Sequence, residues 1–372
     1  MNARFDLTTP KYRLRARGVA HRVTPARWEG ACVADAVDAA LAAAVKAGRG
    51  GAKPIVIGLV PFDSATPGVF YVPAGVDWGK ADSVPSPEGD RPAEPVEVRG
   101  GDSPAYRASV AEALRRIQAG TLDKVVLARS VTVEAASPFD DDRVYARLCA
   151  QNRNAYVYRM DLPVDPGHAG SAVVLGASPE LVLGSDRRMI RSLPLAGSSP
   201  RAANEFADRE AARALLGSRK DLAEHMHVVQ AVGETFRRYA DHVEVPREPQ
   251  LVQTPVIWHL GTPITGVLRP GVSPIELMYA LHPTPAVGGW PQEIARQTIA
   301  DLETADRGFY AGLIGWMDAE GNGEWVLVLR GGVVTGNVAT VFAGAGIVAN
   351  SDPEKEHVET ATKLRTFISA LG

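Results

Sequence analysis

The residues most able to do chemistry are two pairs of acidic side chains that lie far apart in the chain. One pair is Asp221 and Glu224, and the other is Glu356 and Glu359. Each pair has i, i+3 spacing in a helical stretch, so its two carboxylates share one helix face. Four carboxylates brought together would repel one another unless a cation lay between them, and an all-oxygen set suits Mg²⁺ better than zinc. A surface ladder of ion pairs is the alternative, because lysines lie four residues from Glu224 and Glu359.

Lys124 and Glu180 are candidates for proton transfer. Lys124 begins an otherwise apolar strand, KVVLA, where a lysine usually extends its amine to water. The alternative is a buried, neutral lysine that acts as a base. Glu180 follows Pro179 between two apolar runs, and burial there would raise its carboxyl pKa, as a general acid requires. Ser178 is not expected to be a nucleophile, because Pro179 has no N–H for an oxyanion hole.

A glycine run, GAGIVA, occupies residues 344–349 and matches the G-x-G-x-x-A pattern of dinucleotide-binding proteins. The next helix begins several residues too late for such a site, near Ser351. A tight turn is the better interpretation, since the exposed N–H groups of Gly344, Ala345 and Gly346 could then receive a carboxylate. A purely structural turn is the alternative.

Periodicity and capping signals predict the elements that must position these groups. Helices are expected over residues 31–47, 106–120, 203–217, 219–240 and 353–370, and strands over 55–60, 124–129, 172–184, 325–330 and 338–343. Ser178-Pro179 interrupts one strand, and Ser351-x-x-Glu354 is a capping box for the last helix. Residues 79–104 are rich in Pro, Gly, Asp and Glu and predict a linker or long surface loop. Because helices and strands do not alternate regularly, the expected class is α+β with antiparallel sheets.

Composition limits the class of protein. The chain has 372 residues, 45% hydrophobic and 22% charged, as in soluble globular proteins. A formal net charge of −3 gives no reason to expect nucleic-acid binding, and no apolar run is long enough to span a membrane. The polar N-terminus shows no secretory signal, so we expect a cytoplasmic protein. Cys32 and Cys149 are expected to be buried free thiols, and His225-x-His227 points to different helix faces, which disfavours zinc.

An ordered set of motifs from about Ser103 to the C-terminus resembles the chorismate-utilising enzymes, which include anthranilate, aminodeoxychorismate, salicylate and isochorismate synthases. The motifs are LDKVVLAR, LGASPELVL, LPLAGS, KDLAEHMHVV, WHLGTP, LHPTPAVGG, GFYAGLIGW, WVLVLR, AGAGIVANSDPEKE and HVETATK. The resemblance implies one large α+β domain whose two antiparallel sheets pack at a steep angle, with helices outside and the active site in a cleft. Residues 103–372 would form the catalytic region, and residues 1–102 would complete the sheets.

Three positions and one short stretch indicate the subgroup within this resemblance. Water-using members resemble this chain in having lysine at the Lys124 position, whereas ammonia-using members tend to have glutamine. Ala196 stands where aminodeoxychorismate synthases carry a lysine nucleophile, which disfavours a covalent amine mechanism. Ser198 and the stretch PAVGG at 285–289 differ from the usual salicylate synthase pattern. The isochorismate synthases of siderophore and menaquinone pathways are most similar, which implies no amidotransferase subunit. Because nothing in the sequence requires a partner, we expect a monomer.

The resemblance implies an Mg²⁺-dependent conversion of chorismate to isochorismate. Lys124 would take a proton from the water that attacks ring C2, and Glu180 would protonate the departing C4 hydroxyl. Arg330 and Tyr310 would hold the pyruvyl carboxylate. Mg²⁺ would bind the ring carboxylate and would be held by Glu224 and Glu359, with Asp221 and Glu356 contributing directly or through water. The residues implied in substrate binding are Gly197, Ser198, His259, Ala286, Tyr310, Arg330, Gly344, Ala345, Gly346 and Lys363.

Three rival functions stay open at this point. A salicylate synthase would form isochorismate and then eliminate pyruvate. A nucleotide-binding oxidoreductase would use the GAGIVA run. A non-catalytic binding protein would keep the pocket, although the presence of both Lys124 and Glu180 argues against it.

Overall fold

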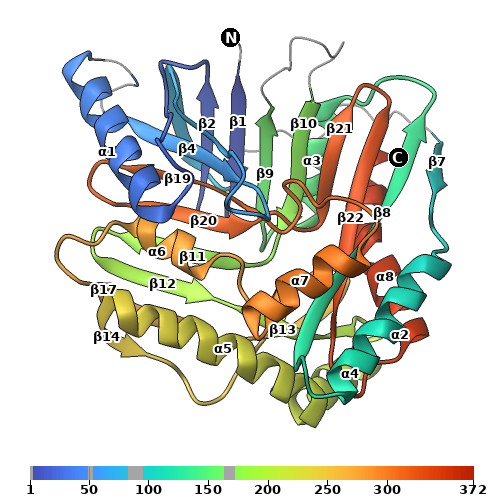
Figure 1. Cartoon of the computed structure of the whole chain (residues 1–372). Helices are drawn as coiled ribbons and strands as arrows, with labels where there is room; N and C mark the ends of the chain where they lie inside the picture. The colour runs from blue at the N-terminus through green and yellow to red at the C-terminus, as the bar shows by residue number, and fades with distance from the viewer. Residues whose placement is uncertain (1–2, 49, 51–52, 83–94, 163–171) are drawn as a thin grey trace.

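The computed structural model describes residues 3–48, 50, 53–82, 95–162 and 172–372, and within them two large antiparallel sheets pack face to face (Figure 1). In the view of Figure 1, strands of the first sheet run nearly vertically, whereas those of the second run across them. The α+β class with antiparallel sheets is therefore confirmed. No helix of the described residues is both long and apolar enough to cross a bilayer.

The first sheet has ten strands within the described residues. Their order is β18 (Gly289–Trp290), β8 (Lys124–Ala135), β22 (Val338–Ile347), β21 (Gly331–Thr335), β10 (Ala172–Ser178), β9 (Tyr156–Asp161), β1 (Arg4–Thr8), β2 (Tyr12–Arg17) and β6 (Gly75–Lys80), and β7 (Val96–Arg99) also pairs with β8. The long strands β8 and β22 pair with each other within this sheet. This pair places strand residues from two distant parts of the sequence beside each other.

The second sheet has nine strands in the same part of the chain. Their order is β14 (Ala240–Glu244), β17 (Ile264–Leu268), β12 (Met189–Leu193), β11 (Leu181–Asp186), β20 (Gly323–Leu327), β19 (Leu313–Asp318), β4 (Ile55–Val60), β5 (Val69–Val72) and β3 (His21–Arg22). A small third sheet consists of β13 (Leu195–Pro200), β16 (Ile257–Gly261) and β15 (Gln250–Gln253). Strands from the first hundred residues thus belong to both large sheets.

Helices cover the outer faces of the two large sheets, so the molecule has four layers. Their bounds are α1 (Gly30–Lys46), α2 (Pro104–Gln118), α3 (Asp141–Gln151), α4 (Glu205–Gly217), α5 (Arg219–Tyr239), α6 (Pro274–Leu281), α7 (Gln292–Leu302) and α8 (Pro353–Leu371). Apolar side chains of α1, α5 and α6 pack on the second sheet, and those of α2, α3, α7 and α8 pack on the first. Between the sheets, Phe5, Leu7 and Tyr158 share one core cluster with Ile57 and Trp316. Successive side chains of a strand point to opposite faces, so a continuous apolar run such as Ile55–Val60 supplies both of its buried faces.

The chain passes from the first sheet to the second at the predicted interruption. Strand β10 ends at Ser178, and β11 begins at Leu181 in the other sheet. Proline has no N–H for a strand ladder and fixes its own φ, so Pro179 ends the pairing there. Glu180 consequently lies at the point where the two sheets meet.

Several predicted boundaries are wrong. Strands β6 and β7 occupy parts of the predicted 79–104 loop, and residues 83–94 of it lie outside the described residues. Strand β20 ends at Leu327, before the expected end at residue 330. Asp352, and not Ser351, caps α8, because its carboxylate accepts the N–H groups of Glu354 and Lys355. The predicted cap, Ser351, is therefore the residue just before the observed one.

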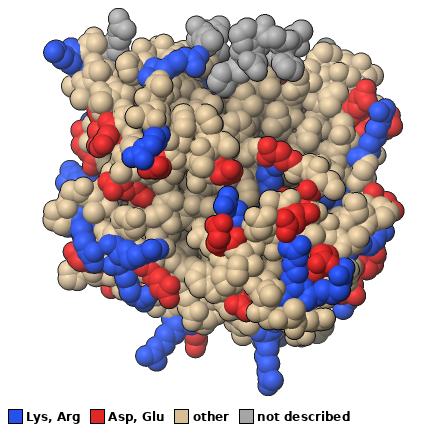
Figure 2. All heavy atoms as spheres, viewed as in Figure 1, with Lys and Arg blue, Asp and Glu red and all other residues tan. Residues whose placement is uncertain are grey.

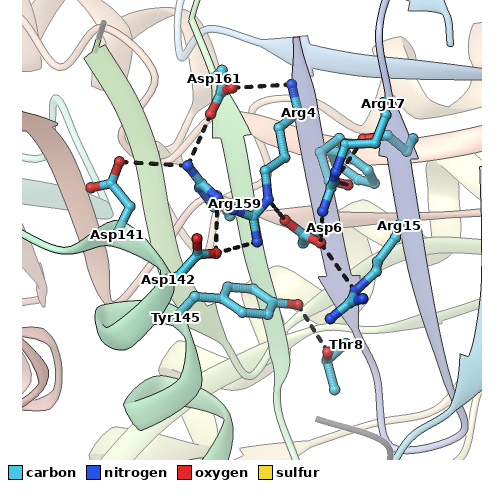
Figure 3. Close-up of polar contacts among 12 residues, drawn as sticks. Arg4, Asp6, Thr8, Arg15, Arg17, Asp141, Asp142, Tyr145, Arg159 and Asp161 are labelled. Carbon is cyan, nitrogen blue, oxygen red and sulfur yellow. Dashed lines mark hydrogen bonds and ion pairs between the residues drawn. The ribbon is translucent and has the colours of Figure 1, made fainter. Parts of the chain in front are cut away.

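An arginine–aspartate cluster lies on the α3 side of β1, β2 and β9 (Figure 3). It comprises Arg4, Asp6, Arg15, Arg17, Asp141, Asp142, Arg159 and Asp161. Asp6 is fully buried and forms ion pairs with Arg4, Arg15 and Arg17. Antiparallel register explains the contacts, since Asp6 lies opposite Arg15 on β2 and opposite Arg159 on β9.

Figure 2 shows acidic and basic side chains mixed over one whole face of the molecule.

Candidate active site

A cavity of about 280 Å³ lies where both large sheets, the small sheet, α5 and α8 come together. Most residues that the sequence singled out line this one cavity. They are Glu180, Gly197, Ser198, Asp221, Glu224, His259, Ala286, Tyr310, Arg330, Gly344, Gly346, Glu356, Glu359 and Lys363. These residues extend from position 180 to position 363 of the sequence, so only the tertiary fold brings them together.

Lys124 is completely buried, so the expectation that its amine reaches water is wrong. It is the first residue of β8, and its Nζ lies 3.0 Å from Oε1 of Glu224 on α5. Gly346 on the paired strand β22 leaves room for this contact. A Cβ at position 346 would lie 2.3 Å from Glu224 Oε1 and 3.3 Å from Lys124 Cε. Lys124 is not itself a lining residue, and it reaches the cavity through Glu224.

Glu180 is buried in the cavity wall with 4% of its surface exposed. Burial raises the pKa of Glu180 to about 8, although the Leu195 N–H and the charges of Lys124 and Arg330 act in the opposite direction. Glu180 makes no ion pair with any described residue. At neutral pH this carboxyl is therefore mostly protonated and can donate a proton into the cavity.

Helices α5 and α8 direct four carboxyl groups into the cavity. Asp221 and Glu224 lie one turn apart on α5, and Glu356 and Glu359 lie one turn apart on α8. Burial raises the pKa of Asp221, and the charges of Glu224 and Glu359 raise it further. Burial raises the pKa of Glu356 in the same way, with Glu359 adding to the effect. The two pairs are thus close enough to influence each other's ionisation.

Each of the three glutamates also faces a lysine. Glu224 lies 3.0 Å from Lys124, Glu356 lies 3.3 Å from Lys220, and Glu359 lies 2.5 Å from Lys363. The contact between Glu359 and Lys363, four residues apart on α8, is one that an ion-pair ladder on a helix surface would also show. The three glutamates, however, line a cavity. As they stand, no three Asp, Glu, His or Cys side chains of the described residues form a group that could hold a metal ion.

The donor chemistry of the four carboxyl groups fits a hard divalent cation. All of their donor atoms are oxygens, and each of the three glutamates forms an ion pair with a lysine. Burial alone would raise the pKa of Glu359, but Lys363 and a hydrogen bond from Ser198 lower it below its usual range. Glu359 is therefore ionised and available as a ligand.

Arg330 supplies a cation with spare hydrogen-bond donors. Its Nη2 donates to Nε2 of His259 at 3.2 Å, while Nη1 is buried without a hydrogen-bond partner among the described residues. Burial lowers the pKa of His259 well below its usual range, so the ring is neutral and its Nε2 can accept. Its Nδ1–H then donates to the Gly197 carbonyl at 3.4 Å. The unpaired guanidinium nitrogen suits a carboxylate of a ligand.

Glycines allow close approach on two sides of the cavity. Gly197 has φ +76°, and a Cβ there would lie 2.9 Å from Asp221 Cβ on α5. Gly344 accepts a hydrogen bond from Lys363 Nζ at 2.9 Å, and a Cβ there would lie 3.2 Å from the Tyr310 hydroxyl. Tyr310 stacks on Phe342 with a centroid separation of 5.2 Å, and burial raises the pKa of Tyr310 to about 12.

The predicted turn at Gly344–Gly346 is wrong. These residues lie inside β22 and pair with Ala128, Leu127 and Val126 of β8. Strand residues alternate between faces, so Gly344 and Gly346 face the cavity. Ala345 points the other way into the core beneath α2 and α7 and does not line the cavity. The run also lacks the strand-to-helix turn of a dinucleotide site, which removes the support for an oxidoreductase.

Some lining residues were missed or misassigned by sequence reasoning. They include Val126, Leu329, Phe342 and Val287, together with Lys220 and Lys355. Alternation along β22 could have identified Phe342, because it shares a face with Gly344 and Gly346. Lys220 was considered a helix-surface partner of Glu224, but it pairs with Glu356 across two helices. No local sequence signal predicts that pairing.

Comparisons with known proteins agree with this arrangement. A family model described as chorismate binding enzyme matches residues 80–372. Isochorismate synthase DhbC of Bacillus subtilis (strain 168) is 36% identical over 373 residues, covering 99% of this chain and 93% of DhbC. Isochorismate synthase EntC of Escherichia coli (strain K12) is 38% identical over 339 residues, covering 90% and 85% of the two chains. The crystal structure of DhbC from Bacillus anthracis matches with a TM-score of 0.92 and 35% identity, covering 100% of this chain and 96% of that one. The chain therefore belongs to the chorismate binding enzyme family.

Proposed function

We propose that this protein is an Mg²⁺-dependent isochorismate synthase that converts chorismate to isochorismate. The observation that carries the proposal is the pair of proton-transfer groups at one cavity, a buried Glu180 in its wall and a buried Lys124 behind Glu224. The names of the relatives DhbC and EntC support the same activity. The reaction is an isomerisation in which a hydroxyl group is lost from C4 and gained at C2.

Two proton transfers account for the chemistry. Lys124 takes a proton from the water that attacks C2 of the ring, the double bonds shift, and the C4–O bond breaks. Glu180 gives its proton to the departing hydroxyl, which leaves as water, so one water is consumed and one is released. General acid and general base catalysis of this kind is each worth about 10²–10⁴-fold in rate. Lys124 must be uncharged to act as the base in its step.

The substrate carboxylates have matching partners in the cavity. Arg330 offers its unpaired Nη1 to the pyruvyl carboxylate, beside the hydroxyl of Tyr310. Glu224 and Glu359 would hold Mg²⁺, with Asp221 and Glu356 as further or water-mediated ligands. The ion when bound would neutralise the ring carboxylate of chorismate.

Incubation of the purified protein with chorismate and Mg²⁺ tests the proposal. Isochorismate without pyruvate, measured by chromatography, is the expected result. Pyruvate together with fluorescent salicylate would identify the rival salicylate synthase. An unchanged chorismate pool would identify a binding protein without turnover and would reject the proposal.

The metal ligands are tested by titration. We expect Glu224→Ala and Glu359→Ala to weaken Mg²⁺ binding by about tenfold or more, because each removes a charged oxygen donor. Isothermal calorimetry measures the affinity directly, and the Mg²⁺ dependence of turnover provides a second measure. Glu205→Ala, in an exposed ion pair on α4, is the matched control. A metal titration that is the same in all variants would count against this ligand set.

A further inference from the structure

One edge of β8 lacks a partner strand along its middle. Strand β18 pairs with β8 at Lys124 and Val125, and β7 pairs with it only from Thr132 to Ala135. Between these points no strand of the described residues pairs with this edge. Open edge groups in a protein interior need other hydrogen-bond partners. The same stretch holds Val126, which lines the cavity two residues after Lys124.

Glu303 and Arg307 fill this gap with their side chains. Glu303 Oε1 accepts the N–H of Ala128 at 2.7 Å, as a neighbouring strand carbonyl would. Arg307 Nη2 donates to the Val126 carbonyl at 2.7 Å, and Nη1 donates to the Val287 carbonyl at 2.8 Å. These bonds join β8 to the 284–288 segment, which supplies another part of the cavity wall.

The two side chains are rigidly held and excluded from solvent. Their relative exposures are 2% for Arg307 and 7% for Glu303, and they are joined by contacts of 2.5 and 2.9 Å. The Arg307 guanidinium also lies over the Phe62 ring, 4.2 Å from its centroid. The Arg307 carbonyl accepts the N–H of Tyr310 at 2.8 Å, so the same residue holds a third lining residue. We call this pair the Glu303–Arg307 clamp.

We propose that the Glu303–Arg307 clamp is a positioning device for the reaction, an inference that rests on the proposed function. Through Val126, Val287 and Tyr310 it sets the separation of three cavity-lining segments, and it holds the strand that begins with Lys124. Neither residue lines the cavity or could contact the substrate. Small displacements of reacting groups are costly, since about 1 Å can reduce a rate about 10²-fold.

Arginine is needed here for a geometric reason. Its planar guanidinium donates in fixed directions to two carbonyls and two carboxylate oxygens. A lysine at this position keeps the charge and the ion pair with Glu303, but its single nitrogen has three donors and cannot span both carbonyls. Arg307→Lys therefore separates the positioning role from the charge.

The test compares Arg307→Lys with Arg159→Lys. Arg159 is a matched control because it is also buried and makes several ion pairs, but it lies in the arginine–aspartate cluster away from the cavity. We expect both variants to lower the melting temperature. Only Arg307→Lys should reduce kcat/KM per folded molecule, by about tenfold to hundredfold and mainly through kcat. Equal effects of the two variants on kcat/KM, or none from Arg307→Lys, would overturn the proposal.

Variants of Glu303 and a measurement that does not depend on turnover provide a second test of the clamp. Glu303→Gln keeps an acceptor for Ala128 and should reduce kcat by less than Arg307→Lys does. Glu303→Ala removes the acceptor, so hydrogen exchange at the Ala128 amide should become faster, whether or not the protein turns over chorismate. Unchanged exchange would refute the clamp alone. A wild-type protein that does not convert chorismate would refute the proposed function and the positioning role with it.

Discussion

In the arginine–aspartate cluster of Figure 3, the central charged groups each form several ion pairs, whereas in the cavity Arg330 and Glu180 form no ion pair with any described residue. Asp6 contacts three arginines, and Arg159 contacts three aspartates. In the cavity, Nη1 of Arg330 donates no hydrogen bond to any described residue, and burial raises the pKa of Glu180 to about 8. Both regions lie along the first sheet, so the fold alone does not cause the difference.

The comparison shows that the partners of a buried charged group indicate whether its role is structural or functional. A buried charge that already forms several ion pairs is compensated within the protein, and removing one partner leaves an uncompensated charge. A group whose pKa is shifted by burial in a cavity has capacity for proton transfer or binding. Substitutions in the cavity should therefore change activity, and those in the cluster should change stability.

The largest expected effect comes from the two proton-transfer groups. We expect Lys124→Gln and Glu180→Gln each to lower kcat by at least about 10²–10⁴-fold, because each removes a general base or a general acid. Circular dichroism should show that the fold is retained. Lys46→Gln, at an exposed position near the end of α1, is the control. Normal turnover in either active-site variant would remove the role assigned to that residue.

A smaller effect is expected at Arg330. Hydrogen bonds to charged groups contribute about 1.5–3 kcal/mol, so Arg330→Gln should lower kcat/KM by about tenfold to hundredfold. The loss should appear mainly in KM, because the substrate carboxylate is bound in the ground state and in the transition state alike. Steady-state kinetics over a range of chorismate concentrations separate the two constants. A normal KM would show that another group binds the pyruvyl carboxylate.

The pH dependence follows from Glu180. Its folded pKa is raised from 4.5 to about 8, so the proton needed for catalysis is present below about pH 8 and is lost above it. Activity should fall about tenfold for each pH unit well above that value. The free energy of unfolding should change with pH in the same direction as the activity. The contribution of the protonated Glu180 carboxyl to stability is complete below pH 4.5 and is lost as the pH rises through about 8.

Two measurements check this pH dependence. The pH profile of kcat/KM gives the activity limb. Chemical denaturation at several pH values should show a decline between pH 5 and 8 that is absent in Glu180→Gln. A flat activity profile up to pH 10 would contradict the assignment of Glu180 as the acid.

The smallest effect on activity is expected in the cluster. Asp6→Asn should lower the free energy of unfolding by about 3 kcal/mol, because three arginines lose a buried anionic partner. Its kcat/KM should stay within about twofold of the wild-type value, since Asp6 is remote from the cavity lining. Denaturant unfolding and steady-state kinetics on the same preparation measure both quantities. A large loss of activity in a folded Asp6→Asn protein would break the contrast between the two regions.

The sequence by itself determined the local facts of this protein. Helical periodicity placed Asp221 with Glu224 and Glu356 with Glu359 on shared faces, and Pro179 marked the strand end beside Glu180. Spacings of three residues on a helix and the missing N–H of proline have their effect within one turn of chain. Such features can be predicted without knowledge of the fold.

Only the tertiary structure decided which of these local features meet. The pairing of β8 with β22 converted a predicted glycine turn into strand and turned Ala345 away from the cavity. The approach of α5 to α8 gave Lys220 its partner Glu356, and the open edge of β8 was completed by the side chains of Glu303 and Arg307. These contacts join residues far apart in the chain, and their energies depend on burial that local sequence does not specify.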